Sequence, residues 1–208
     1  MKTHESFAFK PAELGYFNTG SVDPVLKNFA AGCRIMGLTR GQFSLIDLIH
    51  GVLKRTGNAH VVICTWSAGI KDAHQVDWLL STRLIRTIRL ITDHSYATRQ
   101  RKYAVSITDL FGPENIRTSE VHAKFVLIHN EDHKVAIRSS MNLNANKTCE
   151  TFEIDEDQEI FDFYWSFCTH LFDDMPVGFV ESSWTANHSL DKFFGAKQTD
   201  IFTGWSDL

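Results

Sequence analysis

The alternation of apolar and polar positions predicts a chain in which strands and helices follow one another. Apolar residues recur at positions 43, 46, 48, 49, 52 and 53, the spacing of one helix face, after a capping-box pattern at 39–42 and before Gly57. Four further elements are expected: a strand over 60–66, a helix over 72–84, a strand over 87–92 and a helix over 96–110. This order is typical of an α/β sheet with parallel crossovers.

The second half of the chain is predicted to form a hairpin, a short strand and a helix. Apolar strands are expected over 116–129 and 134–139, joined by the polar turn 130–133, and a short strand is expected over 151–154. Residues 156–172 mix acidic residues with apolar and aromatic ones, which predicts a helix whose aromatic side packs on the sheet.

The length and composition predict a single domain. With 208 residues, of which 43% are hydrophobic, the chain can bury one sizeable core. Residues 1–38 are expected to form an N-terminal extension packed on that core, in which Asp23 and Pro24 open a short helix. Residues 39–175 form the domain itself. Residues 176–208 are too aromatic for a disordered tail, with Phe202 and Trp205 near their end, and are expected to pack on the domain or on a dimer partner.

Net charge and cysteine usage limit the binding partners and the cellular compartment that can be expected. The net charge of −4 argues against a protein that coats nucleic acid, but six basic residues lie between 83 and 102, where they could guide an anionic substrate. The four cysteines are far apart, which favours reduced thiols and a cytoplasmic location. Because we find neither a secretion signal nor an apolar run of membrane-spanning length, no membrane partner is expected.

Five polar residues in the second half could share one surface. The pattern H-x-K places His122 and Lys124 on the same face of a strand, and S-x-N does the same for Ser140 and Asn142. Such a cluster on apolar strands is costly unless it finds partners, which a phosphodiester would supply. Lys124 and Asn142 would bind its oxygens, His122 would attack phosphorus, Glu150 would hold the imidazole tautomer, and Ser140 would brace the carboxylate or the phosphate. The alternative is an exposed edge hairpin without chemistry.

The pattern His122-x-Lys124, Ser139-Ser140-x-Asn142 and Glu150 resembles the signature of the phospholipase D superfamily, and the resemblance covers residues 40–175. It implies an α/β fold with a mixed sheet flanked by helices on both faces. The sequence departs from the family pattern at three points. His129 stands where the family has an Asp, Ser140 follows Lys124 by sixteen residues in a longer hairpin, and Glu153 is a rival to Glu150 as the orienting carboxylate.

The resemblance also implies a mechanism. Family members combine two such motifs and this chain has one, so it implies a homodimer in which His122 of one copy forms a phosphohistidine and His122 of the other acts as the acid. No metal or other cofactor is called for, and His129, Asp132 and His133 more closely fit a solvated turn than a zinc site.

The predicted function is that of a metal-independent phosphodiesterase, a nuclease that cleaves DNA or RNA. The alternatives are a nucleic-acid-binding module without turnover and a phospholipid-type phosphodiesterase. Five further residues are expected to contact the substrate, because ligands bind at the carboxyl ends of strands in open sheets and arginines suit phosphates. They are Trp66, Ser67, Arg99, Arg101 and Ser139.

Overall fold

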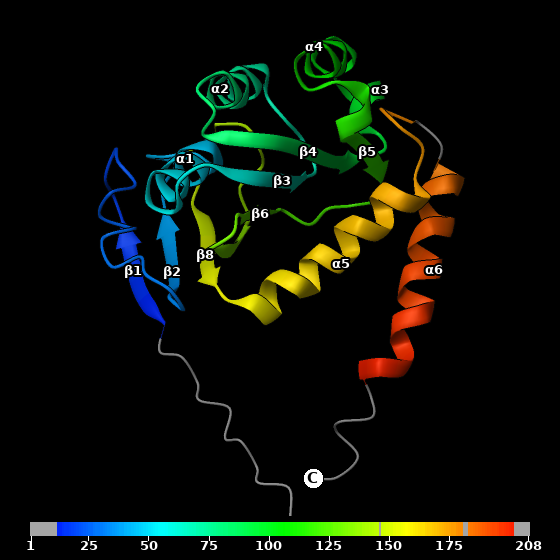
Figure 1. Cartoon of the computed structure of the whole chain (residues 1–208). Coiled ribbons are helices and arrows are strands. Elements are labelled where there is room, and N and C mark those ends of the chain that lie inside the picture. Colours follow the sequence, from blue (N-terminus) through cyan, green and yellow to red (C-terminus); the bar gives the residue numbers. More distant parts are fainter. Residues whose placement is uncertain (1–11, 146, 181–182, 202–208) are drawn as a thin grey trace, which may run out of the picture.

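A computed structural model of the chain describes residues 12–145, 147–180 and 183–201. Its centre is one eight-stranded sheet with the strand order β1-β2-β8-β7-β6-β3-β4-β5 (Figure 1). The strands are β1 (Glu13–Phe17), β2 (Arg34–Thr39), β3 (Ala59–Thr65), β4 (Ile85–Asp93), β5 (Ile116–Ser119), β6 (Phe125–His129), β7 (Lys134–Ser139) and β8 (Glu150–Glu156). β3, β4 and β5 are parallel, β1 is parallel to β2, and the pairs β3–β6, β6–β7, β7–β8 and β2–β8 are antiparallel.

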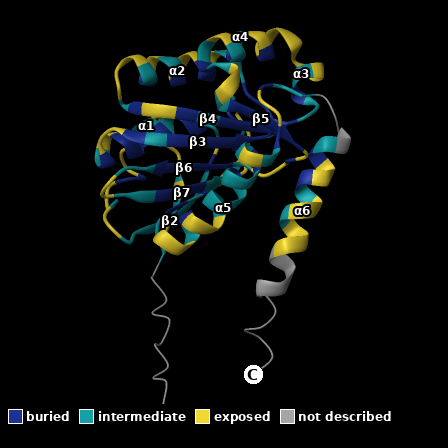
Figure 2. Ribbon diagram, turned by 45° about the vertical axis from the view of Figure 1, so that its right-hand side comes forward, coloured by how far each residue is buried: buried dark blue, intermediate teal, exposed yellow. Residues whose placement is uncertain are grey.

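Helices cover both faces of this mixed sheet, as predicted. They are α1 (Leu45–Thr56), α2 (Ile70–Ser81), α3 (Tyr96–Arg99), α4 (Arg101–Phe111), α5 (Gln158–Asp174) and α6 (Ser183–Ile201), with a short 3-10 turn at Pro113–Asn115. α1, α2 and α4 bury apolar residues against one face, and α5 and α6 do so against the other. Figure 2 shows the buried residues gathered along the central strands between these layers. The fold class inferred from the sequence is therefore confirmed.

The first helix begins later than its sequence pattern indicated. Its N-cap is Ser44, whose hydroxyl accepts from the Asp47 backbone at 3.4 Å, while the Asp47 carboxylate accepts from the Ser44 backbone at 2.8 Å. The predicted capping box at 39–42 is wrong, because Thr39 is the last residue of β2. Gly57 closes the helix with a φ of +81°, a conformation that favours glycine.

Three other expectations need correction. The stretch 116–129 is two strands: β5 lies at the sheet edge beside β4, and β6 lies between β3 and β7. The polar residues 117–120 interrupt the apolar pattern of this stretch in the sequence. The predicted helix over 96–110 is interrupted at Gln100, whose φ of −133° is not helical. Asp23 and Pro24 lie in a turn and open no helix.

The N-terminal segment adds two strands that the sequence did not reveal. β1 and β2 each carry a glycine at their centre, which weakens a strand pattern. A Cβ atom at Gly37 would lie 2.5 Å from the ring of Phe152, and one at Gly15 would lie 2.5 Å from the ring of Phe17. Glycine is therefore required because aromatic rings fill the inner face of these strands.

The last described helix, α6, packs against β5 and α5. Phe193 contacts the ring of Phe167 at 5.4 Å between centroids, whereas Phe202 and Trp205 lie outside the described residues. The cysteines are free thiols, and Cys64 and Cys168 are buried as expected. Among the described residues, no helix combines the length and the apolar character needed to cross a membrane.

Candidate active site

Five strands begin or end at one border of the sheet, the border formed by the carboxyl ends of β3 and β4, which is the edge of the sheet at which the candidate site lies. β3 and β4 end there, β7 also ends there, and β6 and β8 begin there, because each antiparallel neighbour reverses direction. The segment 120–124 links the edge strand β5 to β6 and so passes the carboxyl ends of β4 and β3. This crossing carries His122 and Lys124 to the place where ligands bind in open α/β sheets.

His122 and Lys124 lie just before β6 rather than inside a strand. The Lys124 ammonium donates to the His122 carbonyl at 2.8 Å and lies 3.4 Å from Nδ1 of the same residue. The His122 side chain is exposed and Lys124 is half-buried, and the Lys124 carbonyl accepts from the Ser139 backbone at 3.0 Å, which extends the β6–β7 ladder. Burial lowers the pKa of Lys124 from its ordinary value, although the Glu150 carboxylate opposes that shift.

Ser140 and Glu150 form the second part of the site. The Ser140 hydroxyl donates to Oε2 of Glu150 and accepts from the Thr151 backbone at 2.9 Å. Thr148 donates to Oε1 of Glu150 at 2.9 Å. Both carboxylate oxygens are thus held, and Ser140 braces the carboxylate. Among the described residues, the ring of His122 makes its polar contact with Lys124 and none with Glu150.

Glu153, the alternative to Glu150 as the orienting carboxylate, lies further along β8 and is paired with an arginine. Glu153 is three residues further along β8 and forms an ion pair with Arg138, which also binds Asp155 at 2.6 Å. This pairing occupies Glu153 on the face of the sheet that α5 partly covers. Of the two carboxylates, Glu150 is the one whose charge acts on Lys124.

Asn142 is positioned by the end of β3. The buried hydroxyl of Thr65 lies 3.4 Å from Oδ1 of Asn142 and 2.9 Å from the carbonyl of Ser67, and it accepts from the Leu143 backbone at 3.1 Å. The Gly69 backbone donates to the Leu143 carbonyl at 2.7 Å. These bonds tie the S-x-N segment to the carboxyl end of β3 and leave the Asn142 amide group partly exposed.

An aromatic and cationic stack borders the imidazole. The rings of Trp66 and His122 have centroids 5.6 Å apart, and the Arg99 guanidinium lies 3.8 Å over the Trp66 ring. Arg99 also donates to the Trp66 carbonyl at 3.2 Å and to the Ser95 hydroxyl at 2.9 Å, and Ser95 in turn binds the buried carboxylate of Asp93. The guanidinium is therefore held in place while one of its faces remains open.

The other three predicted substrate contacts have different positions. Ser139 uses its hydroxyl within the chain, because it donates to the Thr151 carbonyl at 2.8 Å and accepts from the Met141 backbone at 2.9 Å. Ser67 is nearly buried at the end of β3. Arg101 is exposed at the first turn of α4, two residues beyond Arg99.

The residues considered for a metal lie at the opposite edge of the sheet. His129 ends β6 and stacks on His60 with centroids 5.0 Å apart, and its ring also contacts Trp165. His133 lies 3.2 Å from Glu156, and Asp132 is exposed in the turn. Within the ranges that the structure describes, no three His, Cys, Asp or Glu side chains gather in a way that could hold a metal ion.

The positioning roles of two threonines, and the position of one further histidine, were not predicted from the sequence. Thr65 and Thr148 hold Asn142 and Glu150, and the available signal was a polar residue directly at a strand end or two residues before the carboxylate. His94 follows β4 at the same edge, with Nδ1 buried and 3.8 Å from the Asp93 carboxylate.

Comparison with known proteins supports the fold and reaches no further. No protein-family model and no curated protein matches the sequence. Among solved structures, NucT from Helicobacter pylori is similar with a TM-score of 0.50 and 16% identity, over 70% of this chain and 99% of that chain. Nuc from Salmonella typhimurium, a phospholipase D family member, is similar with a TM-score of 0.48 and 11% identity, over 69% of this chain and 96% of that chain. At this identity the likeness to NucT shows the fold alone, and the chain shares that fold.

Proposed function

We propose that this protein is a metal-independent phosphodiesterase that cleaves nucleic acid through a phosphohistidine on His122, in an active site shared by two copies of the chain. The observation that carries the proposal is the convergence of His122, Lys124, Asn142 and the Ser140–Glu150 pair at one edge of a phospholipase D-like sheet. A nucleophile, a cation, an amide donor and a braced carboxylate are groups that can together carry out phosphoryl transfer.

The first step forms the covalent intermediate. A bound phosphate oxygen draws the Lys124 ammonium away from Nδ1 of His122, 3.4 Å distant in the free chain. Nε2 of His122 then attacks phosphorus as the bond to the leaving oxygen breaks, and the imidazolium of the second copy protonates that oxygen. Lys124 and Asn142 stabilise the charge on the remaining oxygens.

The second step releases the product. The imidazole of the second copy, now neutral, takes a proton from water, whose oxygen attacks phosphorus as the phosphorus–nitrogen bond breaks. Both steps need two imidazoles, and the chain offers one H-x-K pattern with its S-x-N. A homodimer supplies the second.

Nucleic acid is the proposed substrate because of the groups that border the imidazole. The open face of the Arg99 guanidinium, stacked on Trp66, could contact a base or a phosphate, and Arg101 adds charge nearby. The free thiols support an intracellular, cytoplasmic setting.

The test is cleavage of DNA and RNA, single-stranded and duplex, in the presence of EDTA. We expect the wild type to cut at least one of these substrates and His122→Ala to cut none, and we expect acid quenching during turnover to trap phosphate on His122. If both proteins bind nucleic acid and neither cleaves it, the protein is a nucleic-acid-binding module and not an enzyme. Cleavage only with an added divalent cation would keep a nuclease and refute this mechanism.

A further inference from the structure

The carboxyl ends of β4 and β5 carry polar groups that the fold alone does not use. Five buried side-chain polar atoms lack a hydrogen-bond partner among the described residues, and three of them lie here: Thr92 Oγ1, His94 Nδ1 and Ser119 Oγ. β4 and β5 pair Asp93 with Ser119, and the His94 backbone donates to the Ser119 carbonyl at 2.9 Å. Because burying an unpaired polar group is costly, this concentration indicates a role other than packing.

His94 is arranged to present one ring nitrogen outward. Its Nδ1 is buried and lies 3.8 Å from Oδ2 of Asp93, whose other oxygen accepts from the Ser95 backbone at 3.0 Å and from the Ser95 hydroxyl. Nε2 makes no hydrogen bond with any described residue and, unlike Nδ1, is not a buried atom, so it reaches solvent. A carboxylate behind one nitrogen fixes the ring and leaves the other nitrogen to a ligand.

The same network holds the Arg99 guanidinium. Its Nε donates to the Ser95 hydroxyl at 2.9 Å and its Nη2 donates to the Trp66 carbonyl at 3.2 Å, which leaves Nη1 without a hydrogen bond in the part of the chain that the structure describes. Asp93 and Ser95 therefore connect two groups that stay open to a ligand, Nη1 of Arg99 and Nε2 of His94. Both follow the end of β4, at the edge of the sheet at which the candidate site lies.

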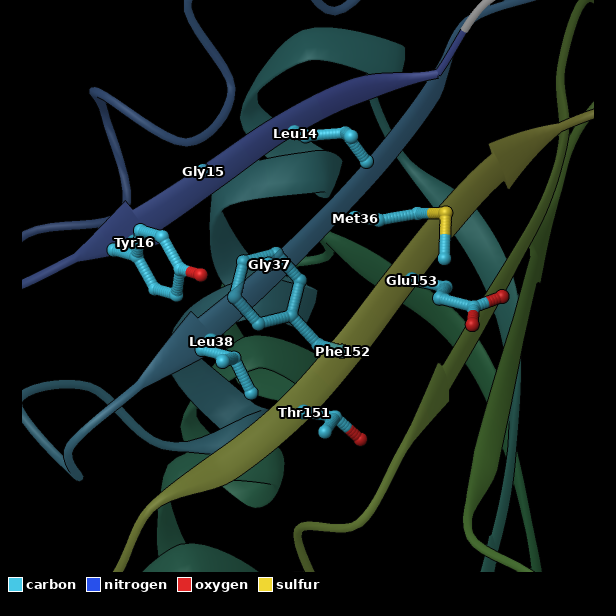
Figure 3. A pocket seen from close by; sticks show the side chains of 9 residues that line it. All are labelled: Leu14, Gly15, Tyr16, Met36, Gly37, Leu38, Thr151, Phe152 and Glu153. Atoms are coloured by element: carbon cyan, nitrogen blue, oxygen red, sulfur yellow. The ribbon is translucent and has the colours of Figure 1, made fainter.

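The hollow between β1, β2 and β8 shows a contrasting surface (Figure 3). It measures about 500 Å³, and its lining includes Leu14, Tyr16 and Met36. The charged residue of that lining, Glu153, is paired with Arg138. Its lining therefore offers a phosphate no free cation, whereas the ends of β4 offer a guanidinium and an imidazole that are both held in place.

We propose that His94 and Arg99 bind the phosphate that neighbours the scissile phosphate in a nucleic-acid strand. The inference rests on the proposed function, in which His122 attacks the scissile phosphate. β3 and β4 are neighbouring parallel strands, about 4.8 Å apart, so Trp66 and His94, which directly follow their ends, place this second site beside the first. With anionic oxygens in front of the His94 ring and Asp93 behind it, the bound ring is an imidazolium that donates from both nitrogens.

The second site would select the class of substrate. A nucleic acid carries a phosphate at every nucleotide, whereas a simple phospholipid diester and bis(p-nitrophenyl) phosphate carry one. The nucleic acid alone can occupy both sites at once. Its affinity should therefore depend on His94 more strongly than the affinity of a small diester does.

Cleavage of a short single strand of DNA and of bis(p-nitrophenyl) phosphate by the full chain in EDTA tests the second site. We expect His94→Gln to lose about 10-fold in kcat/KM on the DNA, through a higher KM, and to show a several-fold smaller loss on the diester. His133→Gln is the matched control, because His133 also lies beside a carboxylate, 3.2 Å from Glu156, but at the opposite edge of the sheet. Its rates on both substrates should equal those of the wild type.

The salt dependence of DNA affinity gives a readout that a merely structural role would not change. Fluorescence anisotropy of a labelled DNA strand measures this affinity and needs no cleavage. In His94→Gln the slope of log affinity against log salt concentration should decrease by about 0.7, the contribution of one phosphate contact on a single strand. His133→Gln should keep the wild-type slope.

Two results would overturn the proposal. Equal losses of His94→Gln on the two substrates mean that His94 does not act on a neighbouring phosphate, and an unchanged KM for DNA means that His94 binds no phosphate. If the wild type cleaves neither substrate, the proposed nuclease falls and the affinity measurement still decides. A weaker affinity with a lower salt slope in His94→Gln then supports the second phosphate site, and a wild-type affinity and slope refute it.

Discussion

The two ends of β6 carry the same residue type in opposite environments. At one end His122 is exposed, lies 3.4 Å from an ammonium and borders a Trp–Arg stack. At the other end His129 is half-buried among His60, Trp165 and Phe161. Burial and the nearby cations lower the pKa of His129, which therefore favours the neutral ring.

Under the proposed function, the chemistry lies at the His122 end of β6 and not at the His129 end. His129 occupies the position that the phospholipase D superfamily usually gives to Asp, and here that position is a packing site at the far edge of the sheet. The proposed reaction needs His122 and Lys124 and makes no use of residue 129. Position relative to the strand ends, rather than residue type, distinguishes the two histidines.

The largest expected effect on the cleavage rate comes from comparing substitutions of His122 and His129, at the two ends of β6. His122→Ala should reduce the cleavage rate in EDTA by about 10⁴-fold or more, because it removes the nucleophile and the acid together. His129→Asp, which introduces the residue that the resembled signature has at this position, should leave the rate within about 3-fold of wild type because residue 129 lies outside the site. Single-turnover assays of both variants check this. Equal losses would contradict the division between the ends.

Lys124 and Lys134 offer the same comparison for cations. Lys134 pairs with His129 across the β6–β7 ladder and binds Asp162, so it is the matched control for Lys124. Lys124→Met should cost about 10²- to 10³-fold in rate, and Lys134→Met should cost little. Because burial lowers the pKa of Lys124, the wild-type rate should decline with rising pH before the ordinary lysine value is reached, and Lys124→Arg should move that decline to higher pH. If Lys124→Arg leaves the pH dependence of the rate unchanged, the decline at high pH does not come from the Lys124 ammonium.

The two carboxylates on β8 should differ by a smaller factor. Glu150→Gln weakens the bonds from Ser140 and Thr148 and removes the charge that acts on Lys124, so we expect a rate loss of about 100-fold. Glu153→Gln removes only an ion pair with Arg138 and should retain nearly full activity at low protein stability cost. Steady-state rates of the two variants at saturating substrate decide between them. If Glu153→Gln loses more activity than Glu150→Gln, Glu153 is the carboxylate that supports the reaction.

The neighbouring strand β3 extends the comparison to stability. Thr65 is the last residue of β3 and lies beside the site, and His60, the second residue of β3, pairs with His129. Thr65→Val leaves the buried Leu143 amide and the Ser67 carbonyl without their partner, which should cost about 1–3 kcal/mol in the free energy of unfolding. Urea unfolding measures it. An unchanged midpoint would mean that the S-x-N segment is held by other contacts.

Sequence reasoning reached the fold class and the strands of the hairpin because β3, β6 and β7 contain apolar runs bounded by polar residues. It placed H-x-K and S-x-N inside the strands of the hairpin, whereas the two patterns lie just before β6 and just after β7. It did not reveal β1 and β2, whose glycines make room for the rings of Phe17, in β1 itself, and of Phe152, in β8. It also did not reveal Thr65 as the support of Asn142, because the two are 77 residues apart and meet only through the strand order.

The smallest expected effect lies at the His129 end and depends on pH. Because the folded-state pKa of His129 is below the ordinary value of 6.5, the unfolded chain binds a proton at this site more readily than the folded chain does. This site therefore adds a stability that is complete above about pH 6.5 and is lost as pH falls from there towards the folded-state pKa. His129→Leu removes the titration and keeps the apolar contacts with Trp165, so the wild type should lose more stability than the variant between pH 7.5 and 5.5 in urea unfolding. An equal loss would show that the proton uptake belongs to another histidine, such as His50, whose pKa burial also lowers.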